Sequence, residues 1–239
     1  MAEREMRIIA GARITLNDLA ESLPRWSNTR LVSLLSDAQE EMCKGMPLLT
    51  RKATINTVAG QEEYRLPIDS ISLIRASSEG IALPLISYDV IERSNAGWED
   101  DKGNAFTSII VNALSQQTIR PYPLISASKP LKVRYQALPE RITYNLDDED
   151  TNEELTIDSM WDVGLKQYIV AMAFLDYGDP ASISRSQVAM GLYNKEFQSA
   201  KSLSKKSFSK NVRTTDFQAK VSNQNTGGRY GRGNCRFGY

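Results

Sequence analysis

Hydrophobic residues recur at the spacing of a helix near both ends of the chain. Residues 15–23 (TLNDLAESL) place leucine and alanine on one face and predict a short helix that Pro24 ends. Ser27 is a suitable cap for a second and stronger helix, which Gly45 closes at about Lys44. The core stripe expected for this second helix is Leu31, Leu34, Leu35, Ala38 and Met42.

Two further helices are expected in the last third of the chain. The apolar spacing from Ser159 to Tyr177 indicates a third long helix, and residues 178–180 (GDP) interrupt the chain after it. A fourth helix is expected from about Ser184 to near Ser207, with lysine-rich last turns that suit the negative end of a helix dipole. The residues of the third helix expected in the core are Trp161, Leu165, Tyr168, Ile169 and Met172.

The middle of the chain, residues 49–140, has the alternating texture of short strands. The stretch KATINTVAGQEEYRLP alternates apolar and polar residues around Gly60 and predicts a hairpin. One short helix is expected within SYDVIERSNAGW, with Ser87 as its cap and with Val90 and Ile91 facing inward. Further short strands are expected at residues 71–75, 81–86, 108–111, 118–120 and 131–136.

An acidic connector follows the strands, at residues 141–158. Its carboxylates are Asp147, Asp148, Glu149, Asp150, Glu153, Glu154 and Asp158. Such a cluster can hold calcium, but the glycine that an EF-hand requires at loop position six is missing. We expect a solvated acidic loop, and the alternatives are an anchor for basic arms or the carboxylate pair of a hydrolase.

Together these elements predict an α+β fold. Two amphipathic helices at each end cannot bury their apolar stripes alone, so the simplest solution packs all four into one bundle. An antiparallel β domain is then inserted between the helix pairs, and an extended tail leaves the bundle. The expected divisions are residues 1–48 (N-terminal helices), 49–140 (β domain), 141–158 (acidic connector), 159–209 (C-terminal helices) and 210–239 (basic tail).

The composition removes most enzyme classes. The 239 residues include no histidine, which excludes imidazole acid–base catalysis, histidine-activated nucleophiles and imidazole zinc sites within the chain. Neither a GxxxxGK[ST] phosphate loop nor a GxGxxG turn is present, and Cys43 and Cys235 lack the spacing of a metal or disulfide site. We expect no enzyme activity, no catalytic residues, no metal and no cofactor. No run approaches the roughly 18 apolar residues of a membrane span, which predicts an intracellular protein.

The net charge of zero conceals an asymmetry along the chain. Residues 201–239 carry nine lysines and arginines and one acid, a net charge of +8, so the first 200 residues carry −8. An acidic body with a basic tail can bind an acidic partner, and that partner can be another copy of the chain. The charge distribution is therefore compatible with head-to-tail association.

The chain ends in NTGGRYGRGNCRFGY, where glycine, arginine and aromatic residues alternate. This segment has too few aliphatic residues for a core of its own, so we expect it to be disordered when free. RNA or single-stranded DNA can order it through phosphate contacts and base stacking, and a protein groove can order it by burying the aromatics. The candidate partner-binding residues are Lys205, Lys206, Lys210, Arg213, Phe217, Lys220, Arg229, Tyr230, Arg232, Arg236, Phe237 and Tyr239.

Several short segments together resemble a known family. They are WSNTRLVSLLSDAQEEMCKGMPLL, GQEEYRLPIDSISLIR, GIALPLISYDVIERSNAGW, IRPYP and LKVRYQALPE. Over most of residues 15–200 the chain resembles the adaptor proteins of tailed bacteriophages, which include tail tubular protein A of short-tailed phages and related head-completion connectors. The most recognisable piece is GxxxYxLPxD, which GQEEYRLPID fits from Gly60 to Asp69. These residues concern the fold and carry no chemistry.

The resemblance implies a structural protein of the virion, at the junction of head and tail, made in the cytoplasm of a bacterial host. Proteins of this family form a homo-oligomeric ring, commonly of twelve copies, that docks on the portal protein and supports the tail nozzle or tail tube. The resemblance implies that the helices and a C-terminal extension contact the portal and neighbouring subunits. Transient contact with passing double-stranded DNA is compatible with this role. The alternative is an RNA-binding or single-stranded-DNA-binding protein that uses its arginine, glycine and aromatic tail.

Overall fold

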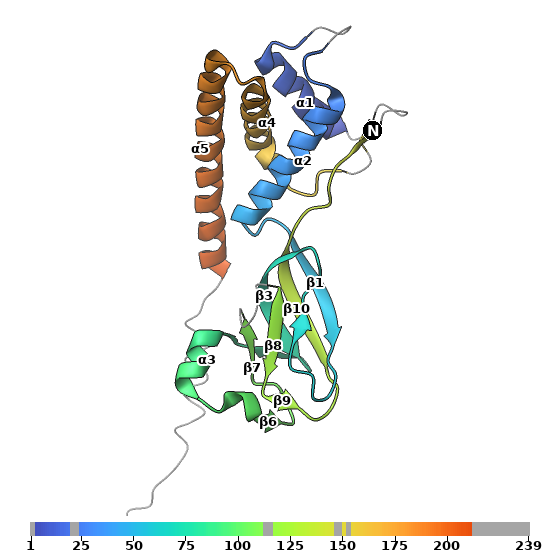
Figure 1. Ribbon diagram of the computed structural model, residues 1–239, viewed down its shortest axis with the longest axis vertical. Coiled ribbons are helices and arrows are strands. Elements are labelled where there is room, and N and C mark those ends of the chain that lie inside the picture. The colour runs from blue at the N-terminus through green and yellow to red at the C-terminus, as the bar shows by residue number, and fades with distance from the viewer. Residues whose placement is uncertain (1–2, 20–23, 112–116, 146–149, 152–153, 212–239) are drawn as a thin grey trace, which may run out of the picture. The chain divides into compact units, whose positions relative to one another are not determined.

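The computed structural model describes residues 3–19, 24–111, 117–145, 150–151 and 154–211, without the side chains of 150–151 and 203–211. The protein has an α+β fold (Figure 1), as the sequence predicted. The chain forms two compact units, Met1–Glu196 and Phe197–Tyr239. The helices are α1 (Glu3–Leu16), α2 (Asn28–Gly45), α3 (Tyr88–Ser94), α4 (Asp162–Tyr177) and α5 (Pro180–Asn211), with 3-10 turns η1 (Trp98–Asp100) and η2 (Ser159–Trp161).

The first helix lies earlier in the chain than predicted. The expectation of a helix over residues 15–23 is wrong, because α1 ends at Leu16 and Asn17 has a left-handed conformation, with φ of 54°. The N–H groups of Asn17 and Asp18 donate back to the carbonyls of Ile14 and Arg13 at 3.2 and 3.0 Å, which is the hydrogen-bond pattern of a Schellman end. Residues 20–23 lie outside the described residues. The side chains that α1 buries are Glu5, Ile8, Ile9, Ala12 and Leu16.

The second and third long helices confirm the sequence interpretation. The Ser27 hydroxyl accepts a hydrogen bond from the N–H of Arg30 at 3.2 Å, so it caps α2 as expected. The predicted third helix corresponds to η2 followed by α4, and Gly178 ends α4 with a φ of 71°. A left-handed glycine at this position costs little because it has no side chain.

The last helix is longer than predicted. It begins at Pro180 instead of about Ser184 and extends to Asn211. Its start is fixed by Asp179, whose Oδ1 accepts from the N–H groups of Ala181 and Ser182 at 2.9 and 3.0 Å. Proline at the first helical position lacks only an N–H that has no partner inside the helix. Residues 178–180 were expected only to interrupt the chain. Gly178 does end α4, but Asp179 and Pro180 also start α5.

The helical core lies where α2 meets α4. Of the predicted core residues, seven have at most 1% of their surface exposed, namely Leu31, Leu34, Leu35, Ala38, Met42, Leu165 and Ile169. Trp161, Tyr168 and Met172 are half-buried. A side chain on Gly164 would start 2.5 Å from the Met42 methyl group, so α4 approaches α2 closely there. The ring of Tyr168 meets that of Tyr193 on α5 edge to face, with centroids 5.3 Å apart.

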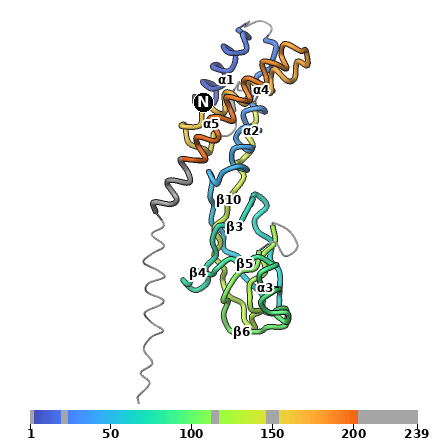
Figure 2. Tube along the Cα trace, turned by 90° about the vertical axis from the view of Figure 1, so that its left-hand side faces the viewer, coloured from blue at the N-terminus to red at the C-terminus, as the bar shows by residue number. Residues whose placement is uncertain are grey.

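Two four-stranded sheets make up the middle of the chain. The first has the order β1–β10–β3–β4 and is antiparallel throughout, and Figure 2 shows β10 and β3 side by side in it. The second has the order β2–β8–β7–β5 and contains one parallel pair, β5 with β7. The strands of the first sheet are β1 (Thr50–Asn56), β10 (Pro130–Ala137), β3 (Ser70–Ser78) and β4 (Ile81–Leu83); those of the second are β2 (Tyr64–Arg65), β8 (Thr118–Tyr122), β7 (Ser108–Val111) and β5 (Leu85–Ser87).

Two small pairs complete the strands. β6 (Lys102–Gly103) and β9 (Leu124–Ile125) are parallel, and β11 (Tyr144–Asn145) and β12 (Asp150–Thr151) are antiparallel. The strands therefore pair mainly antiparallel, as predicted, with two parallel pairs that the sequence pattern did not indicate.

The hairpin predicted around Gly60 is wrong. Gly60 lies in a turn with a φ of 76°, but the strands on its two sides belong to different sheets. β1 pairs with β10 over its whole length, and β2 pairs with β8. Alternation specifies which face of a strand is buried and leaves its hydrogen-bonding partner undetermined.

The two central strands of the second sheet, β7 and β8, are buried on both faces. One core cluster draws Leu131 and Val133 from the first sheet and Ile109 from the second, so the two sheets pack face to face. The neighbouring Ile110 points the other way and packs with Ile91 of α3 and Trp98 of η1. The layers are therefore the first sheet, the second sheet and α3. In α3, Ile91 is buried as predicted, but the expectation that Val90 faces inward is wrong, since Val90 is 56% exposed.

We predict that Asn17→Val lowers the free energy of unfolding by about 1–2 kcal/mol, because a β-branched residue is strained at positive φ. Asn17→Gly is expected to leave stability unchanged or raise it slightly. Asn194→Val on exposed α5 is the matched control, since there the backbone is helical and the two residues have similar helix propensities. Urea unfolding followed by far-UV circular dichroism measures all three. Equal effects of the two valine substitutions would contradict the assigned helix end.

Candidate assembly surfaces

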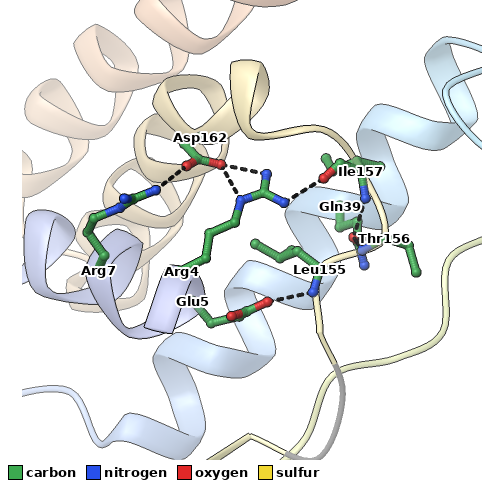
Figure 3. Close-up of polar contacts among 8 residues, drawn as sticks. All are labelled: Arg4, Glu5, Arg7, Gln39, Leu155, Thr156, Ile157 and Asp162. Carbon is green, nitrogen blue, oxygen red and sulfur yellow. Dashed lines mark hydrogen bonds and ion pairs between the residues drawn. The ribbon is translucent and has the colours of Figure 1, made fainter. Parts of the chain in front are cut away.

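Buried polar side chains of α1 and α2 hold the return segment, residues 155–157, which leads from the β domain back to α4 (Figure 3). Glu5 is 2% exposed, and its carboxylate accepts from the N–H of Leu155. Gln39 is fully buried, and its Oε1 accepts from the N–H groups of Thr156 and Ile157 at 2.8 and 3.3 Å. Three consecutive N–H groups outside any helix or strand are thereby satisfied, each of which would cost free energy if buried without a partner.

An arginine and an aspartate connect α1 to the start of α4. Arg4 donates through Nε and Nη2 to Oδ1 of Asp162 at 2.9 and 2.6 Å, and through Nη1 to the carbonyl of Ile157 at 2.6 Å. Arg7 adds a weaker contact to the other carboxylate oxygen at 3.2 Å. Asp162 lies in the first turn of α4, where a negative charge also interacts favourably with the helix dipole. These contacts fix the first turn of α4 against α1 (Figure 3).

A second polar cluster fixes the connection from α1 to α2. The carboxylate of Asp18, 4% exposed, pairs with Arg13 and accepts from the N–H of Arg25 at 2.8 Å. Arg13 also donates to the carbonyl of Trp26 at 2.8 Å and to Oδ1 of Asn28 at 2.7 Å. The chain is therefore held on both sides of residues 20–23, next to the two apolar surfaces described below.

An apolar groove, here called the α5 groove, lies between the end of α1, α4 and α5. Its volume is about 450 Å³. Val188 on its α5 side is 67% exposed, and Arg185 lies over the ring of Phe174 at 5.8 Å from the ring centre. The apolar residues that line it are Leu16, Val170, Phe174, Val188, Ala189 and Leu192. Val188 and Leu192 are exposed side by side on α5, above the buried Leu16, Val170, Phe174 and Ala189, so the groove is a candidate contact surface.

A second apolar depression, here called the α1 depression, lies beside the same helix end. It has a volume of about 460 Å³ and is lined by Ala10, Arg13, Ile14, Asp18, Leu19, Pro24 and Asn28. Ile14 is 66% exposed. Ile14 of the depression and Leu16 of the α5 groove are two residues apart, which is about 200° around a helix. The two surfaces therefore lie on different sides of α1.

Burial raises the pKa values of two groups in the helices, the Cys43 thiol and the Tyr193 hydroxyl. It raises the pKa of the Cys43 thiol to about 11, so this thiol is protonated at neutral pH. Burial likewise raises the pKa of Tyr193 far above its usual range. No group of three cysteine, aspartate or glutamate side chains comes together as metal ligands within the described residues. In the acidic connector, Asp147, Asp148, Glu149 and Glu153 lie outside the described residues, and Glu154 and Asp158 are exposed.

The predicted partner-binding residues fall in two groups. Lys205, Lys206 and Lys210 lie on the last turns of α5. The remaining nine lie outside the described residues, namely Arg213, Phe217, Lys220, Arg229, Tyr230, Arg232, Arg236, Phe237 and Tyr239. The sequence interpretation missed Glu5, Gln39 and Asp162 as structural anchors. A signal for α1 was present, because Ile8, Ile9, Ala12 and Leu16 recur at helical spacing.

The described helices therefore carry two candidate contact surfaces, the α5 groove and the α1 depression. Within the described chain, no helix combines the length and apolarity that a membrane span needs. The model of the SU10 adaptor protein family matches residues 7–219, and the chain therefore belongs to this family of phage head–tail adaptors. No curated protein matches the chain.

We predict that Asp162→Asn lowers the free energy of unfolding by about 1–3 kcal/mol, because it leaves the Arg4 guanidinium without its counter-charge. The side chains of Arg4 and Asp162 are 23% and 20% exposed. The matched control is Asp176→Asn, which breaks a two-bond pair with Arg30 whose side chains are 37% and 43% exposed. For this control we expect a loss below about 1 kcal/mol. Urea unfolding measures both, and equal losses would argue against the anchoring role of Asp162.

Proposed function

We propose that this chain is the structural adaptor between the head and tail of a tailed phage, and that its copies form a ring. The observation that carries the proposal is the pair of unlike apolar surfaces on different sides of α1, in a member of a head–tail adaptor family. A closed ring needs a heterologous interface, in which one face of a subunit meets a different face of its neighbour. The α5 groove and the α1 depression supply two such faces.

In this proposal α1, α2, α4 and α5 act as one four-helix bundle that carries the ring contacts. Residues 49–140 form an inserted β domain that supports the tail nozzle or tail tube, and residues 141–158 connect it to the C-terminal helices, with Ile142, Leu155 and Ile157 buried. A ring of twelve copies docks on the portal protein at the head–tail junction of the virion, after synthesis in the cytoplasm of the host. The role is purely structural and requires neither a cofactor nor catalysis.

The basic C-terminal tail is proposed as the arm that docks on the portal. Its arginines at 229, 232 and 236 pair with carboxylates, and its aromatic residues are buried in a groove as anchors. Ordering such an arm costs conformational entropy, which is offset by weak contacts repeated around the ring. The alternative use of the tail, binding RNA or single-stranded DNA, rests on the same alternation of arginine and aromatic residues.

The ring proposal predicts a specific pattern of assembly defects. Val188→Asp damages the α5 groove and Ile14→Asp damages the α1 depression, so each variant alone is expected to lose subunit contacts. In a mixture of the two variants, the intact α1 depression of a Val188→Asp subunit can still meet the intact α5 groove of an Ile14→Asp subunit. The mixture is therefore expected to give dimers. Both positions are largely exposed, so folding should be unaffected. The measurement is chemical cross-linking followed by gel electrophoresis, in the presence of the portal ring.

Ile68→Asp is the control, because Ile68 is 93% exposed and lies in the β domain, away from both surfaces. It should assemble as the parent chain does. Contacts that survive in either single variant would argue against the pairing of the α5 groove with the α1 depression.

The docking-arm proposal predicts that neutralising the tail weakens portal binding. The triple variant Arg229→Gln, Arg232→Gln and Arg236→Gln is compared with a control in which Arg65, Arg93 and Lys102, all exposed in the β domain, become glutamine. Sedimentation velocity with a portal ring from the same genome is the measurement. The parent and the control should join the ring in a fixed multiple, and the tail variant should join it poorly. If the tail variant docks normally but loses binding to single-stranded nucleic acid, the alternative use of the tail is supported instead.

A further inference from the structure

The first sheet presents an open face that carries four positive charges. Lys52, Arg75, Lys132 and Arg134 project from β1, β3 and β10 and line a shallow groove of about 480 Å³, here called the basic face. All four are exposed. Successive side chains of a strand point to opposite faces, so the neighbours Leu131 and Val133 point into the core while Lys132 and Arg134 point outward.

The strand register gathers these charges closely. Arg134 lies opposite Lys52 on one side and opposite Arg75 on the other, so three cations form one row across β1, β10 and β3. Neighbouring strands are about 4.8 Å apart, which makes the row about 10 Å long. Lys132 lies two residues from Arg134 on the same face, between Thr54 and Ser77.

These four charges are not neutralised within the described part of the chain. None of the four makes an ion pair or a side-chain hydrogen bond there, whereas Arg51, next to Lys52, pairs with Asp69 and Glu140 at 2.9 Å. Like charges directly opposite one another destabilise a sheet. The face therefore carries an electrostatic cost that contacts among the described residues do not offset. An anionic partner would remove it.

The layers of the β domain leave this face accessible. The outer face of the second sheet is covered by α3 and η1, which bury Ile110 against Ile91 and Trp98. The corresponding outer face of the first sheet carries exposed Lys52, Thr54, Lys132 and Arg134 instead. The two sheets therefore differ in what covers them.

We propose that the basic face binds the phosphate backbone of double-stranded nucleic acid without reading its sequence. Its lining supplies lysine, arginine, serine and threonine, which are the side chains that commonly contact phosphates. Its lining residues include no aromatic side chain, which argues against base stacking with a single strand. Protein–protein interfaces usually centre on a large aromatic or aliphatic side chain, and the residues that line this groove expose no such side chain.

This site is separate from the basic tail and from the two apolar surfaces of the helices. It rests on the proposed adaptor role only for the source of the duplex, since DNA leaves the head through such a junction. Binding itself is a property of a single chain. A failure of ring assembly and a failure of duplex binding can therefore be told apart.

The test uses the full chain and a short labelled DNA duplex, with binding followed by fluorescence anisotropy across a salt series. Lys132→Gln combined with Arg134→Gln should lower the slope of log affinity against log salt by about 1.8, since each lost phosphate contact removes about 0.9. At low salt the affinity should fall by roughly tenfold or more. The variant should fold normally, because both side chains are exposed and their mutual repulsion is removed.

The control pair is Arg65→Gln with Lys102→Gln, which removes the same charge from exposed positions on β2 and β6. Parent, variant and control all retain the basic tail, so its contribution cancels in the comparison. The control should keep the slope of the parent. The proposal would be overturned if the two double variants had the same slope of log affinity against log salt. It would also be overturned if the parent chain did not bind the duplex at low salt. If the Lys132→Gln and Arg134→Gln variant lost binding to a poly-glutamate peptide but bound the duplex as the parent does, the proposal would also be overturned. That result would indicate an acidic protein partner.

Discussion

The arrangement of the helices depends on hydrogen bonds between buried side chains and the backbone of the return segment. The chain leaves α2 at Gly45, forms the sheets, and must come back to the same helices before α4 begins. Residues 155–157 lie outside any helix or strand, so their N–H groups have no partner from regular structure. Glu5 and Gln39 supply the acceptors from α1 and α2, and Arg4 clasps Asp162 beyond the segment. Without these partners the return path would bury unsatisfied donors.

The same attachment determines which apolar surfaces the protein exposes. With α4 fixed against α1 and α2, α5 follows after a short turn and packs through Tyr193 on Tyr168. The end of α1 then has the α5 groove on one side and the α1 depression on another, and the ion pair of Arg13 and Asp18 lines the depression. An adaptor has to contact other proteins, and exposed apolar surfaces suit that purpose.

The two four-stranded sheets differ in what covers their faces. The central strands of the second sheet are buried on both faces, with Ile109 toward the first sheet and Ile110 toward α3 and Trp98. The first sheet uses one face for the core and leaves the other to lysine and arginine. Gln136 at the end of β10 donates to the carbonyls of Cys43 and Met46, so the first sheet is also the one attached to α2. The central strands of the second sheet are thus covered on both faces, whereas the first sheet has one covered face and one exposed, charged face.

The sequence by itself determined the elements whose signals are local. The cap at Ser27, the apolar stripe of α2, the strands β7 and β10 and the long helix before Gly178 follow from the preferences of nearby residues, and the α+β class follows from their order. Only the tertiary structure decided the partners of β1 and β2, the mutual contacts of Glu5, Gln39 and the return segment, and the gathering of four cations on one sheet face. Strand pairing and buried hydrogen bonds join residues far apart in the chain, from Lys52 to Arg134 and from Glu5 to Leu155. Local periodicity specifies which side of an element is buried, but it carries no information about what lies against that side.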